Sequence, residues 1–209
     1  MTTPEGTTAY PLTWPVGRPR TPAHKRREAK FRVEFTRSRG ELLHSLELLG
    51  ARDAIISSGL PLRLDGLPLA NAREPADPGV AVYFERRVPA PVSAEWRPFV
   101  IACDTYTKAH HNLRAIGATV EHLRGIQHHG ASGLLEQAFS GFAALPSAPT
   151  ARPWWEVLEV PKDANRDAIA AAYRKLALVR HPDHGGTVEQ FRELTDARIG
   201  AHLAIGAKP

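Results

Sequence analysis

The chain has 209 residues and a net charge of +5, and 43% of its residues are hydrophobic and 23% charged. This composition is typical of a soluble globular protein, and the length suits one ordinary domain or two small ones. No stretch approaches the roughly 18 apolar residues of a transmembrane helix, the first residues lack a secretory-signal pattern, and the single cysteine excludes an intramolecular disulfide. We therefore expect a cytoplasmic protein without a membrane segment.

Almost all of the excess positive charge lies at the start of the chain. Nine lysines and arginines between Arg18 and Arg39 stand against three glutamates in the first 40 residues, a local net charge of +6. Residues 1–30 are also rich in proline, and we interpret them as a basic, irregular arm. Such an arm is commonly a solvated, flexible tail, but it also attracts nucleic acid through counterion release, and both interpretations stay open.

Residues 31–145 are expected to form a small mixed α/β domain. The segment 31–35 alternates apolar and charged residues, which predicts a strand with one wet face. Leucines at helical spacing predict a helix from Glu41 to Gly50. Further strands are expected from the apolar character of residues 54–57, 79–84 and 98–103.

Two helices are expected in the second half of this domain. Asp104 is a suitable N-cap for a long helix, and a second helix is expected over residues 131–143. The residues expected to face inward are Leu113, Ile116, Val120, Leu123 and Ile126 in the first helix, and Leu134, Leu135, Ala138, Phe139 and Phe142 in the second. The segment 59–79 predicts a loop, and the Pro-rich segment 146–153 predicts a linker.

Two weaker patterns bear on metal binding. His111, His122 and His129 share one face of the expected helix, but steps of 11 and 7 residues place them roughly 16 and 10 Å apart, too far for one ion. We therefore predict no metal site and no cofactor.

Asp77 and the strand end at Glu85 resemble the acidic pairs with which nucleases hold Mg²⁺. This pattern and the basic arm support an alternative hypothesis, a nucleic-acid-binding or Mg-dependent nuclease-like protein; the simpler interpretation is a turn aspartate and an exposed, charged strand end.

The C-terminal segment opens with a predicted helix. Asn165 is a suitable N-cap for an Ala-rich helix over residues 166–180, and the dipeptide His181-Pro182 ends it because a residue before proline avoids the α region. The residues expected on its buried side are Ile169, Ala172, Tyr173, Leu176 and Val179.

A second helix is predicted after a turn at Gly185-Gly186. Thr187 and Gln190 have the three-residue spacing of a capping box, which marks the start of this helix. The residues expected to return against the first helix are Phe191, Leu194, Ala197 and Ile199 or Ala201. The pattern therefore predicts two antiparallel helices joined by a tight loop.

Three segments of this region resemble the J-domain (DnaJ-like) family. Trp155-Glu-Val-Leu-Glu-Val resembles the family's opening Tyr-x-x-Leu-Gly-Val, with Glu159 in place of glycine. Ala172-Tyr-Arg-Lys-Leu-Ala resembles the core of its second helix, and His181-Pro-Asp is the tripeptide that defines J domains. The resemblance covers residues 154–209, and the preceding domain resembles no family known to us. The expected fold class is α+β, with a mixed α/β domain followed by an all-α helical-hairpin J domain.

The resemblance implies a co-chaperone that binds a DnaK-type chaperone and stimulates its ATP hydrolysis, with no catalytic residues of its own. The basic face of the first long helix is implied to dock on an acidic surface of the chaperone. The residues implied to make this contact are Tyr173, Arg174, Lys175, Arg180, His181, Pro182 and Asp183. No Gly/Phe-rich stretch and no Cys-x-x-Cys repeats accompany this region, so we expect the preceding domain to select an unknown client or a location.

Overall fold

The protein forms two compact units, Met1–Ala144 and Leu145–Lys208. The N-terminal unit contains a β-sheet with covering helices, and the C-terminal unit is helical, which confirms the expected α+β class. The computed structural model describes residues 7–30, 32–61, 69, 72–88, 94–129, 132–142, 152–181 and 185–206. The predicted linker at 146–153 therefore lies almost wholly outside the described residues.

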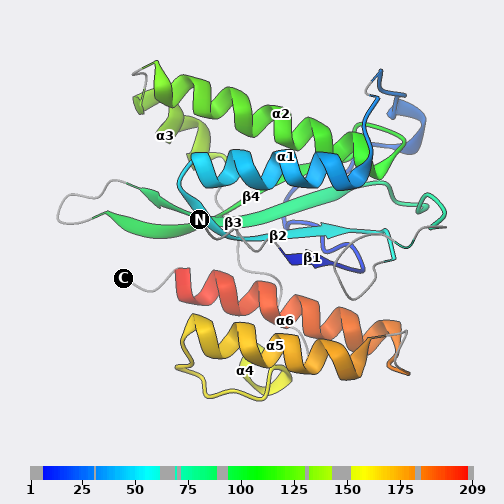
Figure 1. Ribbon diagram of the computed structural model, residues 1–209, viewed down its shortest axis with the longest axis vertical. Helices are drawn as coiled ribbons and strands as arrows, with labels where there is room; N and C mark the ends of the chain where they lie inside the picture. The colour runs from blue at the N-terminus through cyan, green and yellow to red at the C-terminus, as the bar shows by residue number, and fades with distance from the viewer. Residues whose placement is uncertain are drawn as a thin grey trace. The chain divides into compact units, whose positions relative to one another are not determined.

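The N-terminal unit is built on a four-stranded sheet with the order β1-β2-β3-β4 (Figure 1). Strand β1 pairs with β2 in parallel, and the other neighbours are antiparallel. The strands are β1 (Thr7–Ala9), β2 (Ala51–Ser58), β3 (Val80–Val88) and β4 (Glu95–Cys103). The strands predicted from 54–57, 79–84 and 98–103 are thus confirmed, and each extends beyond its predicted bounds.

Helices α1 (Phe35–Leu48) and α2 (Ala109–His128) lie side by side over one face of the sheet (Figure 1). The short helix α3 (Ser132–Ser140) contacts α2 and adds Phe139 to the core, where its ring meets Phe84 and Phe99 edge-on. The inward positions predicted for α2 from Leu113 to Leu123 are buried. Leu134 of α3, in contrast, is 61% exposed, which corrects the prediction that it faces inward.

The predicted strand at 31–35 is wrong. Helix α1 begins at Phe35, and the described residues before it adopt no strand. Phe35 is buried on the same helix face as Leu42 and Leu46, seven and eleven residues later. An alternation over only five residues does not distinguish a strand from a segment leading into a helix.

Asp104 is not the N-cap of α2, because that helix begins five residues later at Ala109. Its carboxylate instead accepts hydrogen bonds from the backbone nitrogen and the hydroxyl of Thr21, at 2.9 and 2.6 Å. The local pattern of a capping residue is therefore overridden by a contact 83 residues away in sequence.

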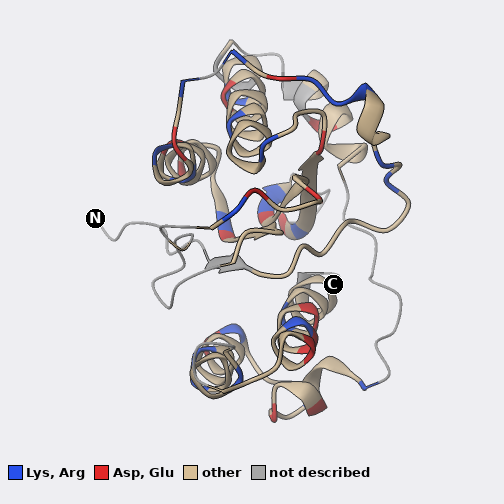
Figure 2. Ribbon diagram, turned by 90° about the vertical axis from the view of Figure 1, so that its right-hand side faces the viewer, with Lys and Arg blue, Asp and Glu red and all other residues tan. Residues whose placement is uncertain are grey.

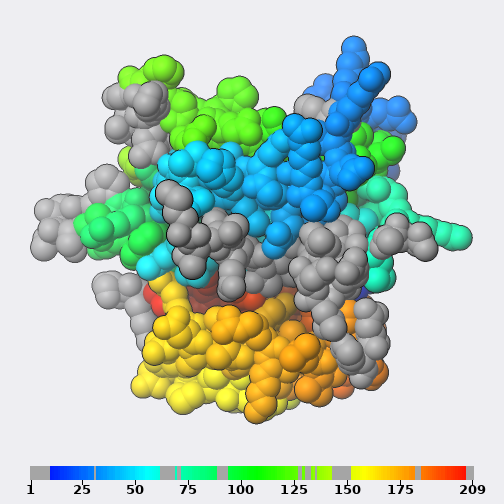
Figure 3. Space-filling view, in the orientation of Figure 1, coloured from blue at the N-terminus to red at the C-terminus, as the bar shows by residue number. Residues whose placement is uncertain are grey.

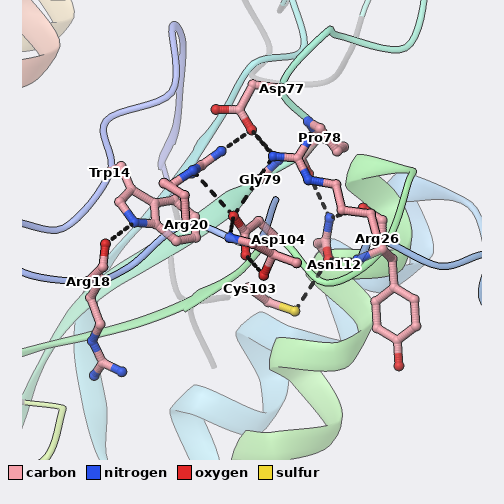
Figure 4. Close-up of polar contacts among 12 residues, drawn as sticks. Trp14, Arg18, Arg20, Arg26, Asp77, Pro78, Gly79, Cys103, Asp104 and Asn112 are labelled. Carbon is pink, nitrogen blue, oxygen red and sulfur yellow. Dashed lines mark hydrogen bonds and ion pairs between the residues drawn. The ribbon is translucent and has the colours of Figure 1, made fainter. Parts of the chain in front are cut away.

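The basic arm, expected to be mostly irregular, is partly integrated into the N-terminal unit. It contains β1 and a short 3-10 helix, η1 (Ala23–Lys25). Arg20 and Arg26 point toward Asp77 and Asp104 (Figure 4), and the Arg20 Nε lies 3.2 Å from the Asp104 carboxylate. Two of the arm's cations are therefore neutralised inside the unit.

The C-terminal unit contains the predicted helical hairpin, preceded by a short helix that the sequence analysis did not predict. The helices are α4 (Trp154–Val157), α5 (Arg166–Arg180) and α6 (Val188–Gly206), and α5 and α6 run antiparallel (Figure 1). Their shared core includes Val157, Leu158, Ile169, Tyr173, Leu176, Leu194, Ala197 and Ala201. Val179 is 68% exposed, which corrects its predicted place on the buried side of α5.

Candidate functional site

Helix α5 begins at a capping residue and presents one face to the core and another to solvent. The Asn165 side chain accepts a hydrogen bond from the Ala168 nitrogen at 2.9 Å, which confirms the predicted N-cap. From this start, Ile169, Tyr173 and Leu176 recur every three or four residues and are buried. The residues between them are therefore turned outward.

The outward face of α5 is basic. Arg174 and Lys175 are exposed, and the helix carries four basic residues against the single acidic Asp167 (Figure 2). Leu178 and Val179 are also exposed, at 57% and 68% of their surface. Side chains of α4 and α5 form much of the visible surface of this unit in Figure 3. Such a mixed basic and apolar surface is chemically suited to an acidic protein partner.

Tyr173 belongs to the core between α5 and α6. Only 5% of its surface is exposed, and the Arg198 guanidinium lies 4.4 Å from the centre of its ring. Burial raises the pKa of the Tyr173 phenol above its ordinary value. As a contact of a partner protein, Tyr173 stays a prediction; in this structure its role is to hold α6 against the helix that carries Arg174.

Arg180, the last residue of α5, points back to the end of α4. Its Nη1 donates to the Val157 carbonyl at 3.2 Å, and its Nη2 donates to the Glu159 carboxylate at 2.9 Å. Sequence reasoning missed Glu159 as a partner of Arg180, because a pair separated by 21 residues leaves no local spacing signal. The only sequence feature that could have indicated this pair is Glu159 itself, which stands where the resembled family has glycine.

His181 is packed at the junction of the two long helices. It is 6% exposed, and its ring meets that of Phe191 edge-on, with 5.0 Å between the ring centres. Its carbonyl accepts a hydrogen bond from the Gly186 nitrogen at 3.0 Å. A Cβ atom on Gly186 would collide with the Arg180 carbonyl, so this close turn requires glycine. Pro182 and Asp183 lie outside the described residues.

The second helix of the hairpin begins with the predicted capping box. The Thr187 hydroxyl accepts from the Gln190 nitrogen at 3.1 Å, and the Gln190 side chain accepts from the Thr187 nitrogen at 3.0 Å. This reciprocal pair determines where α6 starts and therefore how far the loop after His181 extends.

The N-terminal unit does not bring together the acidic pair expected of a nuclease. The Asp77 carboxylate accepts from the Gly79 nitrogen at 3.1 Å, just before β3, whereas Glu85 lies five residues beyond Val80, about 16 Å along the strand. Both carboxylates also pair with arginines, Asp77 with Arg20 and Glu85 with Arg52. Asp77 and Glu85 therefore cannot hold one Mg²⁺ ion between them.

The described residues form neither a metal-binding cluster nor a helix that could cross a membrane. No group of three or more His, Cys, Asp or Glu side chains among them is arranged to hold a metal ion. No helix within the described ranges combines the length and apolar character that crossing a bilayer requires.

A family model described as the DnaJ domain matches residues 153–198. The chaperone protein dnaJ A6 of Oryza sativa subsp. japonica is 45% identical over 56 residues, which are 27% of this chain and 13% of that protein. The DnaJ protein homolog ANJ1 of Atriplex nummularia is 41% identical over 56 residues, with the same coverage. The chaperone protein DnaJ of Methanosarcina acetivorans is 43% identical over 51 residues, 23% of this chain and 13% of that protein.

These matches concern only a part of each protein. The chain spans 13% of the length of the three relatives, and no solved structure matches it. The N-terminal unit has no family assignment. The matched segment contains α4, α5, the His181 junction and the first half of α6. Residues 153–198 of this chain are therefore a DnaJ domain, which confirms the resemblance to the J-domain family.

Proposed function

We propose that this protein is a co-chaperone that binds a DnaK-type chaperone and stimulates its ATP hydrolysis, and that its N-terminal unit selects the client or the location. The observation that carries this proposal is His181 of the family's tripeptide, held at the end of the basic helix α5 within a DnaJ domain. The protein acts in this proposal as a regulator of another protein's ATPase, without catalytic residues of its own.

The proposed mechanism is recognition followed by a shift between two states of the partner. Arg174 and Lys175 on the outward face of α5 attract an acidic surface, which orients the encounter and makes it weaker at high salt. The His181-Pro182-Asp183 tripeptide then stabilises the hydrolysing state of the chaperone. It does so only through a higher affinity for that state than for the resting state.

The test is single-turnover ATP hydrolysis by a bacterial-type DnaK, measured with the full chain and with its His181→Gln variant. We expect stimulation by the natural chain and little or none by the variant. His44→Gln is a matched control, because His44 is an exposed residue of the other unit and this variant should stimulate fully.

Equal stimulation by His181→Gln and the natural chain would contradict the proposed role of the tripeptide. Circular dichroism of the variant controls for loss of the His181–Phe191 packing. Absence of stimulation by every variant would refute the co-chaperone proposal for this chaperone. The nucleic-acid hypothesis would then come first, carried by the exposed Lys25, Arg27 and Lys30 of the arm and by Arg32 just after it.

A further inference from the structure

The turn after α4 contains a strained residue. Glu159 has a φ of 57°, in the left-handed region that residues with a side chain rarely adopt. The Val160 nitrogen donates to the Trp155 carbonyl at 2.9 Å, and the Glu159 nitrogen donates to the Glu156 carbonyl at 3.2 Å. These two bonds form a Schellman motif, in which glycine is the usual residue at the position of Glu159. A glutamate here costs backbone energy that glycine would not.

The Glu159 side chain has a partner that glycine could not provide. Its carboxylate accepts from Arg180 at 2.9 Å, while the same guanidinium donates to the Val157 carbonyl at 3.2 Å. Val157 is the last residue of α4, so no backbone N–H of that helix donates a hydrogen bond to its carbonyl. We call this arrangement of Val157, Glu159 and Arg180 the α4–α5 clamp.

The clamp fixes the backbone next to the proposed functional tripeptide. Arg180 immediately precedes His181, whose ring packs on Phe191 of α6 and whose carbonyl accepts from Gly186. Two consecutive side chains therefore hold the end of α5: Arg180 binds the end of α4, and His181 packs against α6. An exposed ion pair contributes little to stability by itself, so stability is a weak reason for retaining a strained glutamate.

We propose that Glu159 is a positioning residue: it holds Arg180 on the α4 turn and thereby fixes the backbone at the start of the tripeptide, where the buried His181 ring packs on Phe191. Arg180 then acts through His181 and makes no contact of its own with the partner, because docking through its guanidinium would break both bonds of the clamp. This inference rests on the proposed co-chaperone function and offers an alternative to the predicted docking role of Arg180.

The experiment compares Glu159→Gly and Glu159→Gln with the natural full chain in the DnaK assay, over a range of co-chaperone concentrations. We expect the maximal stimulation to fall about fivefold, at the lower end of ordinary coupling between sites, while the half-saturating concentration stays within about twofold. Glu159→Gly also relieves the left-handed strain, so its thermal midpoint should not fall. Glu156→Gln removes an exposed glutamate one turn away and serves as the matched control, with full stimulation expected.

A docking role for Arg180 predicts a different result. Release of the guanidinium by Glu159→Gly would then lower the half-saturating concentration and leave the maximum unchanged, and that outcome would overturn the inference. The exchanged pair, Glu159→Arg with Arg180→Glu, should recover part of the maximal stimulation if the contact itself matters.

Failure of the proposed function can be separated from failure of the clamp. If the natural chain does not stimulate DnaK, amide hydrogen exchange on the protein alone decides the matter. Faster exchange at Val179, Arg180 and His181 in Glu159→Gly than in Glu156→Gln would support the clamp. Unchanged exchange at these three amides would refute it, whatever the chaperone assay shows.

Discussion

At the scale of single residues, Glu85 shows how burial changes the chemistry of a charged group. It is fully buried on β3, and its carboxylate accepts from the Nε and Nη2 of Arg52 at 3.1 and 3.0 Å. The Arg52 guanidinium also lies 3.5 Å from the centre of the Trp96 ring. Burial raises the pKa of Glu85 from 4.5 to about 7, and the attraction of Arg52 opposes this shift. The burial of Glu85 therefore corrects the simpler of the two interpretations of this residue, an exposed, charged strand end.

The raised pKa of Glu85 predicts a pH dependence of stability. The folded protein binds this proton more tightly than the unfolded chain, so the contribution is greatest below pH 4.5 and is lost as the pH rises toward 7. The upper bound of the effect is about 3 kcal/mol, at 1.36 kcal/mol for each pKa unit. Urea unfolding at several pH values should therefore show a decline for the natural chain that Glu85→Gln lacks. Parallel profiles for the two proteins would contradict the assignment.

At the scale of elements, the two long helices of the DnaJ domain begin where their capping residues stand. Asn165 caps α5 through Ala168, and Thr187 caps α6 through Gln190. Each bond satisfies a backbone nitrogen that the first helical turn leaves unpaired. The starts of both helices therefore depend on side chains within three residues of the helix end, which is why the sequence predicted them correctly.

Removal of either cap should destabilise the DnaJ domain measurably. We expect Asn165→Ala and Thr187→Ala each to lower the free energy of unfolding by about 1 kcal/mol, because each leaves a helical nitrogen without its acceptor. Asn165→Asp keeps an acceptor at the same place and should cost only a few tenths of that amount. Denaturant titrations followed by circular dichroism provide the measurement. An equal loss in Asn165→Asp and Asn165→Ala would show that the cap is not the cause.

At the scale of the whole molecule, ion pairs and hydrogen bonds to Asp104 attach part of the basic arm to the rest of the N-terminal unit. Asp104 has a side chain only 6% exposed, and it binds Thr21 and the Arg20 Nε. Asn112 lies nearby (Figure 4), where its amide donates to the carbonyls of Pro78 and Tyr106 at 2.8 and 2.9 Å. These contacts connect the arm, the loop before β3 and the start of α2.

Loss of the Asp104 charge should loosen the arm. We expect Asp104→Asn to increase tryptic cleavage between Arg18 and Arg27 by about tenfold, because hydrogen bonds to a charged group contribute roughly 1.5–3 kcal/mol. Cleavage within α2 should change much less. Glu28→Gln also removes one negative charge, at an exposed position of the arm, and is the control. Limited proteolysis with mass spectrometry tests this, and equal cleavage of both variants would contradict it.

The sequence by itself determined the features whose causes are local. The DnaJ domain was recognised from the order and spacing of its motifs, and its helices from caps and apolar periodicity. Three strands of the sheet were also predicted, since their apolar runs are continuous over several residues. Local hydrogen bonds and periodic burial act over three or four residues, so they are visible in sequence.

Only the tertiary structure decided which distant groups meet. Nothing near Arg180 in sequence indicates Glu159, and nothing near Asp104 indicates Thr21. Val179 shows the same limit, since α5 presents a narrower apolar stripe to α6 than its periodicity suggested. The physical reason is that contacts between elements depend on how whole faces pack, which no short window of sequence specifies.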